Sequence, residues 1–301
     1  MSHIGLGKLI LLGEHAVVYG YPALAAALDR GVRVDSVPTP AGGTLRIDVP
    51  SWNLKVTADD DNSFAHGLAA IADALDLGRP PLTLVGDAQI PPGAGLGASA
   101  AFAVAVSRAL LAHAKRPADT AAVAAAASTS EQVLHGRASG VDVALAIAGG
   151  VGVFRKSTGL RPFQIPPLRV LVGPSGSPRS TAAMVDRVAQ ATSGIVDDTR
   201  LKELGALADT GTAALMRRDI SSLGADMNRA HALLAELGVS TPLLDALCDV
   251  ARKLGAQGAK LTGAGGGGAV IALAPREKEG DILAAWKTAG VNGFLATVGG
   301  R

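Results

Sequence analysis

The chain has 301 residues, a formal net charge of +2, an apolar fraction of 48 % and an aromatic fraction of only 3 %. We expect two domains, because a single hydrophobic core usually stops growing at about 250 to 300 residues. Without a run of five basic residues, and with few aromatic rings on which bases could stack, the chain is not expected to bind nucleic acid.

The apolar segments are too short or too interrupted for a membrane protein. The longest uncharged apolar run, Val143 to Phe154, falls short of the about 20 residues that cross a bilayer and contains three glycines. At the N-terminus, Lys8 interrupts the apolar stretch and no small-residue cleavage site follows it. We therefore expect no membrane association and a cytoplasmic location. The lone Cys248 fits a reducing compartment and is interpreted as a small core residue.

In the first quarter of the chain the pattern predicts mainly strands. Lys8 to Leu12 is predicted to be a buried strand, and the apolar stretch 16–28 is predicted to contain a helix that begins near Pro22. Val32 to Val37 and Thr44 to Val49 are predicted to be paired strands.

Three helices are expected next. Ser63 to Leu75 and Ala98 to Ala114 have helical composition, and Asp119 is placed to cap an alanine-rich helix that ends at Gly136. The segment from Gly136 to Gly140 is then expected to be a loop.

The second half is predicted to alternate helices and strands after a domain boundary near the proline-containing segment Phe163 to Leu168. The strands expected are Arg169 to Gly173 and Gly268 to Ala274, and the helices expected are Thr199 to Arg217, Ser221 to Leu237 and Thr241 to Leu254.

A glycine-rich segment directly before a helix is typical of an anion site. It comprises Pro92, Gly93, Ala94, Gly95, Leu96, Gly97, Ala98, Ser99 and Ala100. Glycines let the backbone approach phosphate oxygens, and the first helical turn offers unpaired N–H groups. Ser99 falls in that turn, where its hydroxyl could bind a metal ion or simply cap the helix. A structural turn is the alternative for the segment as a whole.

Lys8 places a charge inside a strand that should be buried. An isolated buried ammonium is too costly to keep, so Lys8 must have a partner. Asp142, expected in a loop before an apolar segment, is the natural candidate, and an ordinary structural ion pair is the alternative to a catalytic one.

Three motifs together resemble those of the GHMP kinases. They are Lys8 to Ala25 with Gly-Glu-His-Ala-Val-Val-Tyr-Gly, the Gly-Leu-Gly-Ala-Ser-Ala-Ala loop, and Lys260 to Gly268. Within this family His15 and Ala16 resemble the mevalonate kinases rather than the galactokinases or phosphomevalonate kinases, and the segment from Glu131 to Asp142 is similar to theirs. The sequence departs from the residues common in the family at four positions, and these departures concern substrate selectivity rather than the class of reaction. The positions are Ala98, Phe102, Ala138 and Val143.

The resemblance implies a two-domain α+β architecture. It implies a ribosomal S5 domain 2-like N-terminal domain over residues 1–166 and a ferredoxin-like C-terminal domain over residues 167–301, and it is compatible with a homodimer. It also implies transfer of phosphate from ATP to the 5-hydroxyl of mevalonate, an isoprenoid precursor. Another GHMP kinase, or a sensor that has lost the chemistry, is the alternative.

The resemblance further assigns roles to single residues. Asp142 would orient or deprotonate the attacking hydroxyl, Lys8 would stabilise the developing charge, and Ser139 would hold Asp142. Glu131 and Ser99 would bind Mg²⁺, although Glu131 could instead be a solvated carboxylate near its helix end. His135, four residues further on, is not expected to bind the metal, because imidazole is a poor magnesium ligand.

On the substrate side the assignments rest on the same resemblance. Glu14 and His15 match residues of the mevalonate pocket, and His15 could otherwise be a packed turn histidine. Arg155 is a candidate by its chemistry alone, since carboxylates favour a fork of donors. Trp52 lies where the family builds its adenine pocket, with ordinary packing as the alternative. The remaining residues expected to contact substrate are Gly140, Thr262, Gly263, Ala264 and Gly265.

Overall fold

The computed structural model describes residues 3–39, 43–136, 140–177 and 180–300. These residues form two compact units, each with its own core. Unit 1 comprises Met1–Lys8, Asp29–Pro92 and Gly97–Gly149, and unit 2 comprises Leu9–Leu28, Gly93–Leu96 and Gly150–Arg301. A domain boundary between residues 166 and 167 stays a prediction.

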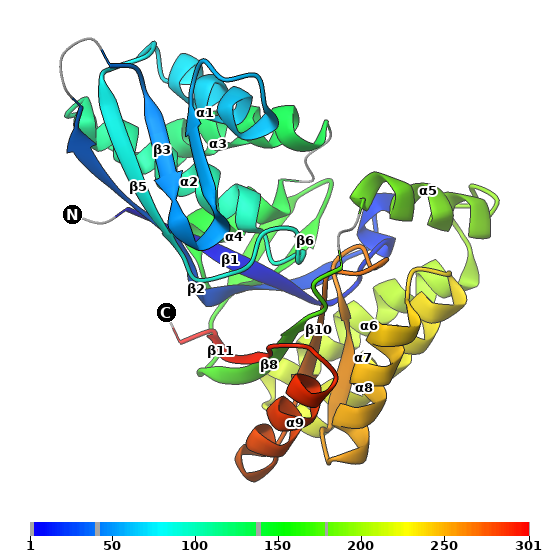
Figure 1. Ribbon diagram of the computed structural model, residues 1–301. Helices are drawn as coiled ribbons and strands as arrows, with labels where there is room; N and C mark the ends of the chain where they lie inside the picture. Colours follow the sequence, from blue (N-terminus) through cyan, green and yellow to red (C-terminus); the bar gives the residue numbers. More distant parts are fainter. Residues whose placement is uncertain (1–2, 40–42, 137–139, 178–179, 301) are drawn as a thin grey trace. The chain divides into compact units, whose positions relative to one another are not determined.

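The first sheet has seven strands among the described residues. Its order is β4-β3-β5-β2-β6-β7, with β1 paired to β2 (Figure 1). The strands are β1 His3–Leu12, β2 Ala23–Pro38, β3 Arg46–Val49, β4 Leu54–Thr57, β5 Leu82–Ala88, β6 Val151–Arg155 and β7 Gly159–Phe163. Strand β5 lies between β2 and β3 and runs parallel to β3, so the predicted pairing of Val32–Val37 with the strand after it is wrong. Adjacent strands in sequence were expected to pair, but β5 arrives from further along the chain.

The helix expected from Pro22 onward is also wrong. Residues 16–19 form a short 3-10 helix, η1 Ala16–Tyr19, and the chain then enters β2 at Ala23. Residues 23–28 are all buried, and Ala23 to Ala26 pair with β6, with Ala23 opposite Phe154. A run that is apolar on both faces shows no periodicity, and its sheet neighbours override the helical preference of alanine and leucine.

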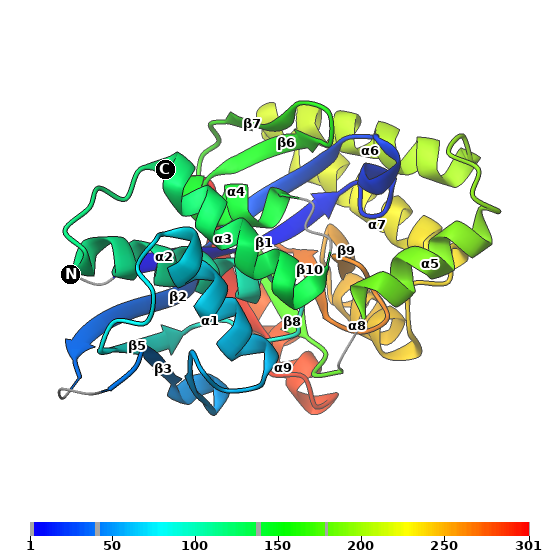
Figure 2. The same cartoon turned by 90° about the horizontal axis from the view of Figure 1, so that it is seen from above.

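Four helices belong to unit 1. They are α1 Ser63–Ala74, α2 Ala98–His113, α3 Thr120–His135 and α4 Val141–Ala148, and α1 to α3 pack against one another (Figures 1 and 2). The predicted cap of α3 is confirmed, since Asp119 Oδ1 accepts a hydrogen bond from the Ala122 amide at 2.9 Å and Gly136 follows the last turn. Asp142, expected in a loop, lies instead in the first turn of α4, because that helix begins directly after Gly140.

Unit 2 holds a four-stranded antiparallel sheet in the order β11-β8-β10-β9. Helices α7 and α8 pack on β9, and α9 packs on β8 (Figure 1). The predicted Thr241 cap of α8 is confirmed. The bounds are β8 Leu168–Pro174, α5 Thr181–Ala191, α6 Thr199–Met216, α7 Ile220–Glu236, α8 Pro242–Lys253, β9 Gly258–Thr262, β10 Ala269–Leu273, α9 Arg276–Thr288 and β11 Phe294–Val298. Among the described residues, no helix is both long and apolar enough to span a bilayer.

Candidate active site

Lys8 and Asp142 form an ion pair in unit 1. The distance from Lys8 Nζ to Asp142 Oδ1 is 3.2 Å, and the Lys8 side chain is only 6 % exposed while that of Asp142 is 29 % exposed. Strand β1 fixes the lysine and the first turn of α4 fixes the aspartate. The prediction that these two residues meet is confirmed. A partly open carboxylate beside a buried ammonium can accept a proton or orient a hydroxyl while the cation stabilises nearby negative charge.

The glycine-rich segment packs directly against Lys8. A Cβ atom on Gly97 would lie 2.8 Å from Lys8 Cγ, and the backbone of Gly97 is left-handed, with φ of 71°. Gly97 is also the residue that precedes α2. The lysine side chain therefore runs past the start of this helix only because residue 97 has no side chain.

The start of α2 has the properties expected of an anion site. Gly93 and Gly95 have positive φ, as Gly97 does, and α2 begins directly after them. In the described part of the chain, a side chain caps the first turn of six other helices, but none caps that of α2. Ala94, Leu96, Ala98 and Ala100 bury their side chains in the core. Only backbone N–H groups at these positions can therefore meet a ligand.

Glu131 is a buried carboxylate near the end of α3. It is 4 % exposed, so the alternative of a solvated carboxylate is wrong. Burial raises its pKa to about 7, and the charge of Asp142 acts in the same direction, while a hydrogen bond from Ser99 opposes the rise. Among the described residues, Oε1 of Glu131 has no hydrogen-bond partner. A buried oxygen of this kind beside a hydroxyl is the donor set that a hard divalent cation favours.

His135 joins the same cluster. Its Nε2 lies 3.0 Å from Ser99 Oγ and 4.0 Å from Glu131 Oε1. Sequence reasoning set this histidine aside as a helix-end residue. Its spacing of four residues from Glu131 was the signal for their proximity, and its contact with Ser99 could not be read from the sequence.

The predicted substrate residues His15 and Ala264 meet in unit 2. His15 is 5 % exposed, its φ is 61°, and its Nε2 lies 2.8 Å from the Ala264 carbonyl oxygen. A carbonyl only accepts, so Nε2 carries the proton and Nδ1 of a neutral ring is an acceptor. Positive φ is uncommon for histidine and is held here by that bond. The turn before η1 is thereby fastened to the segment Thr262–Gly268, which we call the third glycine segment.

Glu14, the neighbour of His15, forms a buried ion pair with Lys260 on β9. Lys260 is fully buried, and its Nζ also donates to the Leu261 carbonyl at 2.6 Å. Burial lowers the pKa of the lysine, and the carboxylate of Glu14 opposes this. Sequence reasoning missed Lys260, although the argument made for Lys8 applies equally to a lysine in an apolar strand.

Thr262 uses its hydroxyl to join β9 to β1. Its Oγ1 donates to the Ile10 carbonyl and accepts from the Ile10 amide, both at 3.0 Å. After it, Gly265 must be glycine, because a Cβ atom there would lie 2.1 Å from the Val239 carbonyl oxygen. A substrate contact for Thr262 stays a prediction, but most of its hydroxyl capacity is used within the fold.

The remaining predicted residues have separate surroundings. Arg155 pairs with Asp209 on α6, with Nη2 3.3 Å from Oδ1, and both side chains are exposed. Gly140 precedes α4 with φ of 81° and open space around it. Ser139 lies outside the described residues. Trp52 donates from Nε1 to the Ile90 carbonyl and contacts Phe64 and Phe102, and its place in an adenine pocket stays a prediction.

Comparison with known proteins relates the whole chain to one family. Residues 63–150 match the model described as GHMP kinases N terminal domain, and residues 212–292 match the one described as GHMP kinases C terminal. A mevalonate kinase of Thermococcus sibiricus is 34 % identical, with 94 % of this chain and 91 % of the relative covered. One from Methanothermobacter thermautotrophicus is also 34 % identical, with coverage of 89 % and 88 %.

Solved structures agree with this relationship. The L. major mevalonate kinase in complex with R-mevalonate superposes with a TM-score of 0.87 at 27 % identity, over 99 % of this chain and 96 % of the other. The Methanococcus jannaschii mevalonate kinase gives 0.86 at 26 % identity, over 99 % and 98 %. The α+β fold class expected from the sequence is thereby confirmed.

Proposed function

Because the chain belongs to the GHMP kinase family, we propose that it is a mevalonate kinase, which transfers the γ-phosphoryl group of ATP to the 5-hydroxyl of mevalonate. The product, 5-phosphomevalonate, is an intermediate of isoprenoid synthesis. One observation carries the chemical part of this proposal: the Lys8–Asp142 ion pair lies beside the uncapped start of α2, because the Lys8 side chain packs on Gly97.

Asp142 and Lys8 have different roles in phosphoryl transfer. Asp142 accepts a hydrogen bond from the attacking hydroxyl, aligns its oxygen with the γ-phosphorus and takes up its proton as the new O–P bond forms. The bond to the β-phosphate oxygen breaks, and ADP leaves with that electron pair. Lys8, buried and fixed in β1, stabilises negative charge on the transferring group.

The segment Pro92–Ala100 binds the nucleotide phosphates through backbone N–H groups, which is compatible with the burial of the side chains of Ala94, Leu96, Ala98 and Ala100 in the core. Glu131 and Ser99 would hold Mg²⁺, which would neutralise charge on the phosphates. The buried Oε1 of Glu131, which has no hydrogen-bond partner among the described residues, supports this assignment. No group of three histidine, cysteine or acidic side chains able to hold a metal occurs in the described ranges, and Mg²⁺ needs only one or two protein oxygens besides ATP.

The substrate is bound by Glu14, His15, Gly140, Arg155 and the third glycine segment. His15 supplies a ring nitrogen whose protonation is set by its bond to Ala264, and the glycines allow close backbone approach. Ser139 is assigned to holding Asp142. The likeness to a kinase whose solved structure contains R-mevalonate supports this substrate.

ADP release measured with mevalonate, phosphomevalonate, galactose and homoserine tests the proposal. Turnover of mevalonate above the other three is expected. Turnover of phosphomevalonate but not mevalonate would identify a different GHMP kinase, and ATP binding without turnover of any acceptor would identify a sensor. We further propose a homodimer, for which light scattering should give about twice the 30.1 kDa chain mass.

A further inference from the structure

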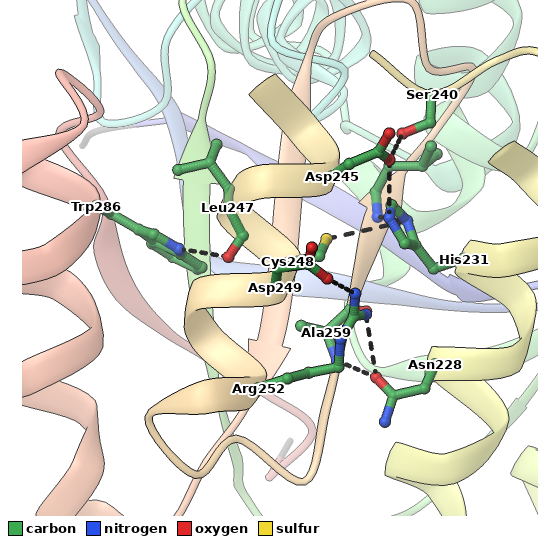
Figure 3. Close-up of polar contacts among 11 residues, drawn as sticks. Asn228, His231, Ser240, Asp245, Leu247, Cys248, Asp249, Arg252, Ala259 and Trp286 are labelled. Atoms are coloured by element: carbon green, nitrogen blue, oxygen red, sulfur yellow. Dashed lines mark hydrogen bonds and ion pairs between the residues drawn. The ribbon is translucent and has the colours of Figure 1, made fainter. Parts of the chain in front are cut away.

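Strand β9, which leads into the third glycine segment, lies at the edge of its sheet. On one side it pairs with β10, and on the other side its backbone groups meet side chains instead of a strand (Figure 3). The Ala259 amide donates to Asn228 Oδ1 at 2.9 Å, and the Ala259 carbonyl accepts from Arg252 at 3.0 Å. The Leu261 amide donates to His231 Nδ1 at 3.3 Å. Helices α7 and α8 thus replace the missing neighbour strand.

His231 can fill its place in only one protonation state. Its Nδ1 must accept a hydrogen bond from the Leu261 amide. Its Nε2 lies 3.1 Å from the Asp245 carboxylate, which can only accept a hydrogen bond, so Nε2 must donate one. The neutral ring with the proton on Nε2 satisfies both contacts. Burial lowers the pKa of His231 to about 4, so this form persists at neutral pH. Ser240 donates a second hydrogen bond to Asp245 and holds the carboxylate toward the ring.

The hydrogen bonds that run from Leu261 through His231 and Asp245 to Ser240 join two backbone segments, and both segments border the third glycine segment. At one end is Leu261, directly before Thr262. At the other end is Ser240, directly after Val239, whose carbonyl oxygen accepts from the Gly266 amide at 2.8 Å. The same carbonyl leaves no room for a side chain at Gly265. Ser240, Asp245 and His231 therefore set the spacing between the strand that enters the glycine segment and the loop on which it rests.

Cys248 lies beside this group without a reactive role. Its Sγ is 3.9 Å from His231 Nδ1, a spacing that could suggest a cysteine–histidine pair. The thiol is fully buried, and burial raises its pKa to about 12, so it stays protonated. A protonated, inaccessible thiol is neither a nucleophile nor a metal ligand.

We propose that His231 is a positioning residue for the reaction: through Leu261 on one side and Asp245 and Ser240 on the other, it fixes the third glycine segment in the shape that receives substrate. This inference rests on the proposed function for the part that concerns catalysis. Its structural part, the ordering of residues 262–268 by His231, is independent of which substrate the enzyme uses.

Two substitutions separate the hydrogen bonds of the ring. His231→Asn keeps an acceptor near the position of Nδ1, and His231→Gln keeps a donor near the position of Nε2. If the bond to Leu261 positions the segment, His231→Gln should speed hydrogen exchange of the amides of residues 263–268 about five- to tenfold and raise the KM for mevalonate by a similar factor. His231→Asn should lie much closer to the wild type in both measurements.

Asn228→Leu is the matched control, because Asn228 binds the other end of the same strand edge, at Ala259. It should lower the thermal unfolding midpoint as His231→Gln does, yet leave exchange of the glycine segment and the KM unchanged. Equal effects of Asn228→Leu and His231→Gln on the segment would overturn the proposal, as would wild-type exchange in His231→Gln. If the wild-type protein does not phosphorylate mevalonate, the proposed function fails while the exchange comparison still decides the role of His231.

Discussion

Several polar groups in unit 1 and in unit 2 differ in how their hydrogen-bonding capacity is used. In unit 1, Glu131 keeps a carboxylate oxygen without a hydrogen-bond partner among the described residues, and Asp142 is partly open. In unit 2, Lys260, Thr262 and His15 all donate to backbone carbonyls. An incompletely satisfied polar group is costly unless a ligand completes it, whereas a satisfied one fixes the chain. The groups in unit 1 are therefore suited to chemistry and those in unit 2 to holding the backbone that surrounds a substrate.

Removing the charge of Asp142 tests the first half of this comparison and should have the largest effect. Asp142→Asn keeps the shape but cannot take up a proton, so turnover should fall by about 10³- to 10⁴-fold with ATP affinity little changed. Steady-state kinetics and nucleotide titration measure the two quantities. Asp73→Asn, which breaks an exposed ion pair with Arg79 in the same unit, is the control and should keep wild-type turnover. Wild-type turnover in Asp142→Asn would remove Asp142 from the mechanism.

The polar groups of unit 2 predict a dependence of stability on pH. The pKa of His231 is about 4 in the folded protein against 6.5 for an ordinary histidine, because burial disfavours the charged ring. The unfolded chain therefore binds the extra proton first as pH falls, and folding loses up to about 3 kcal/mol between pH 6.5 and pH 4. Above pH 7 the ring is neutral in both states and contributes no slope.

Urea unfolding of the wild type and of His231→Asn at several pH values measures this term. The difference between their unfolding free energies should shrink as pH falls from 6.5 to 4 and should be constant from pH 7 to 8. A difference that is the same at every pH would mean that the buried ring is not held neutral.

In unit 1, replacing Glu131 should have a moderate effect on the Mg²⁺ dependence of turnover. Glu131→Gln removes the charge that a hard cation would bind, so the Mg²⁺ concentration for half-maximal turnover should rise at least about tenfold. Ser130→Ala, at the preceding buried position of α3, should keep the wild-type Mg²⁺ dependence. An unchanged Mg²⁺ requirement in Glu131→Gln would leave its buried carboxylate without the assigned role.

The sequence predicted best the features that depend only on residues close together along the chain. The Asp119 cap, the Thr241 cap and the glycine-rich start of α2 are each encoded within a few residues, and all are found in the structure. The Lys8–Asp142 pair was predictable for a different reason, because a buried cation requires a partner and the family motif supplied one.

Contacts between distant segments that no family motif indicated were beyond sequence reasoning. Glu14 and Lys260 are separated by 246 positions, and His231 reaches the Leu261 backbone, which carries no sequence signal at all. The first residues of β2, from Ala23 to Leu28, were mistaken for a helix because their partners in β6 lie far away in the sequence, as for Ala23 and Phe154. In each case the deciding interaction is tertiary, and local propensity is only a weak guide to it.

The smallest expected effect concerns the glycine that packs on Lys8, compared with a glycine elsewhere in unit 1. Gly97 and Gly78 both have left-handed backbones, with φ of 71° and 59°, but a Cβ on Gly78 would meet nothing within 4 Å while one on Gly97 would meet Lys8. Gly78→Ala should cost about 1 kcal/mol in unfolding free energy, because alanine is strained in this region, and Gly97→Ala should cost more, because its Cβ also meets Lys8. Only Gly97→Ala should also lower turnover, by about tenfold, because Lys8 must move away from Asp142 to make room. Equal turnover in the two variants would show that the position of Lys8 does not depend on the missing side chain.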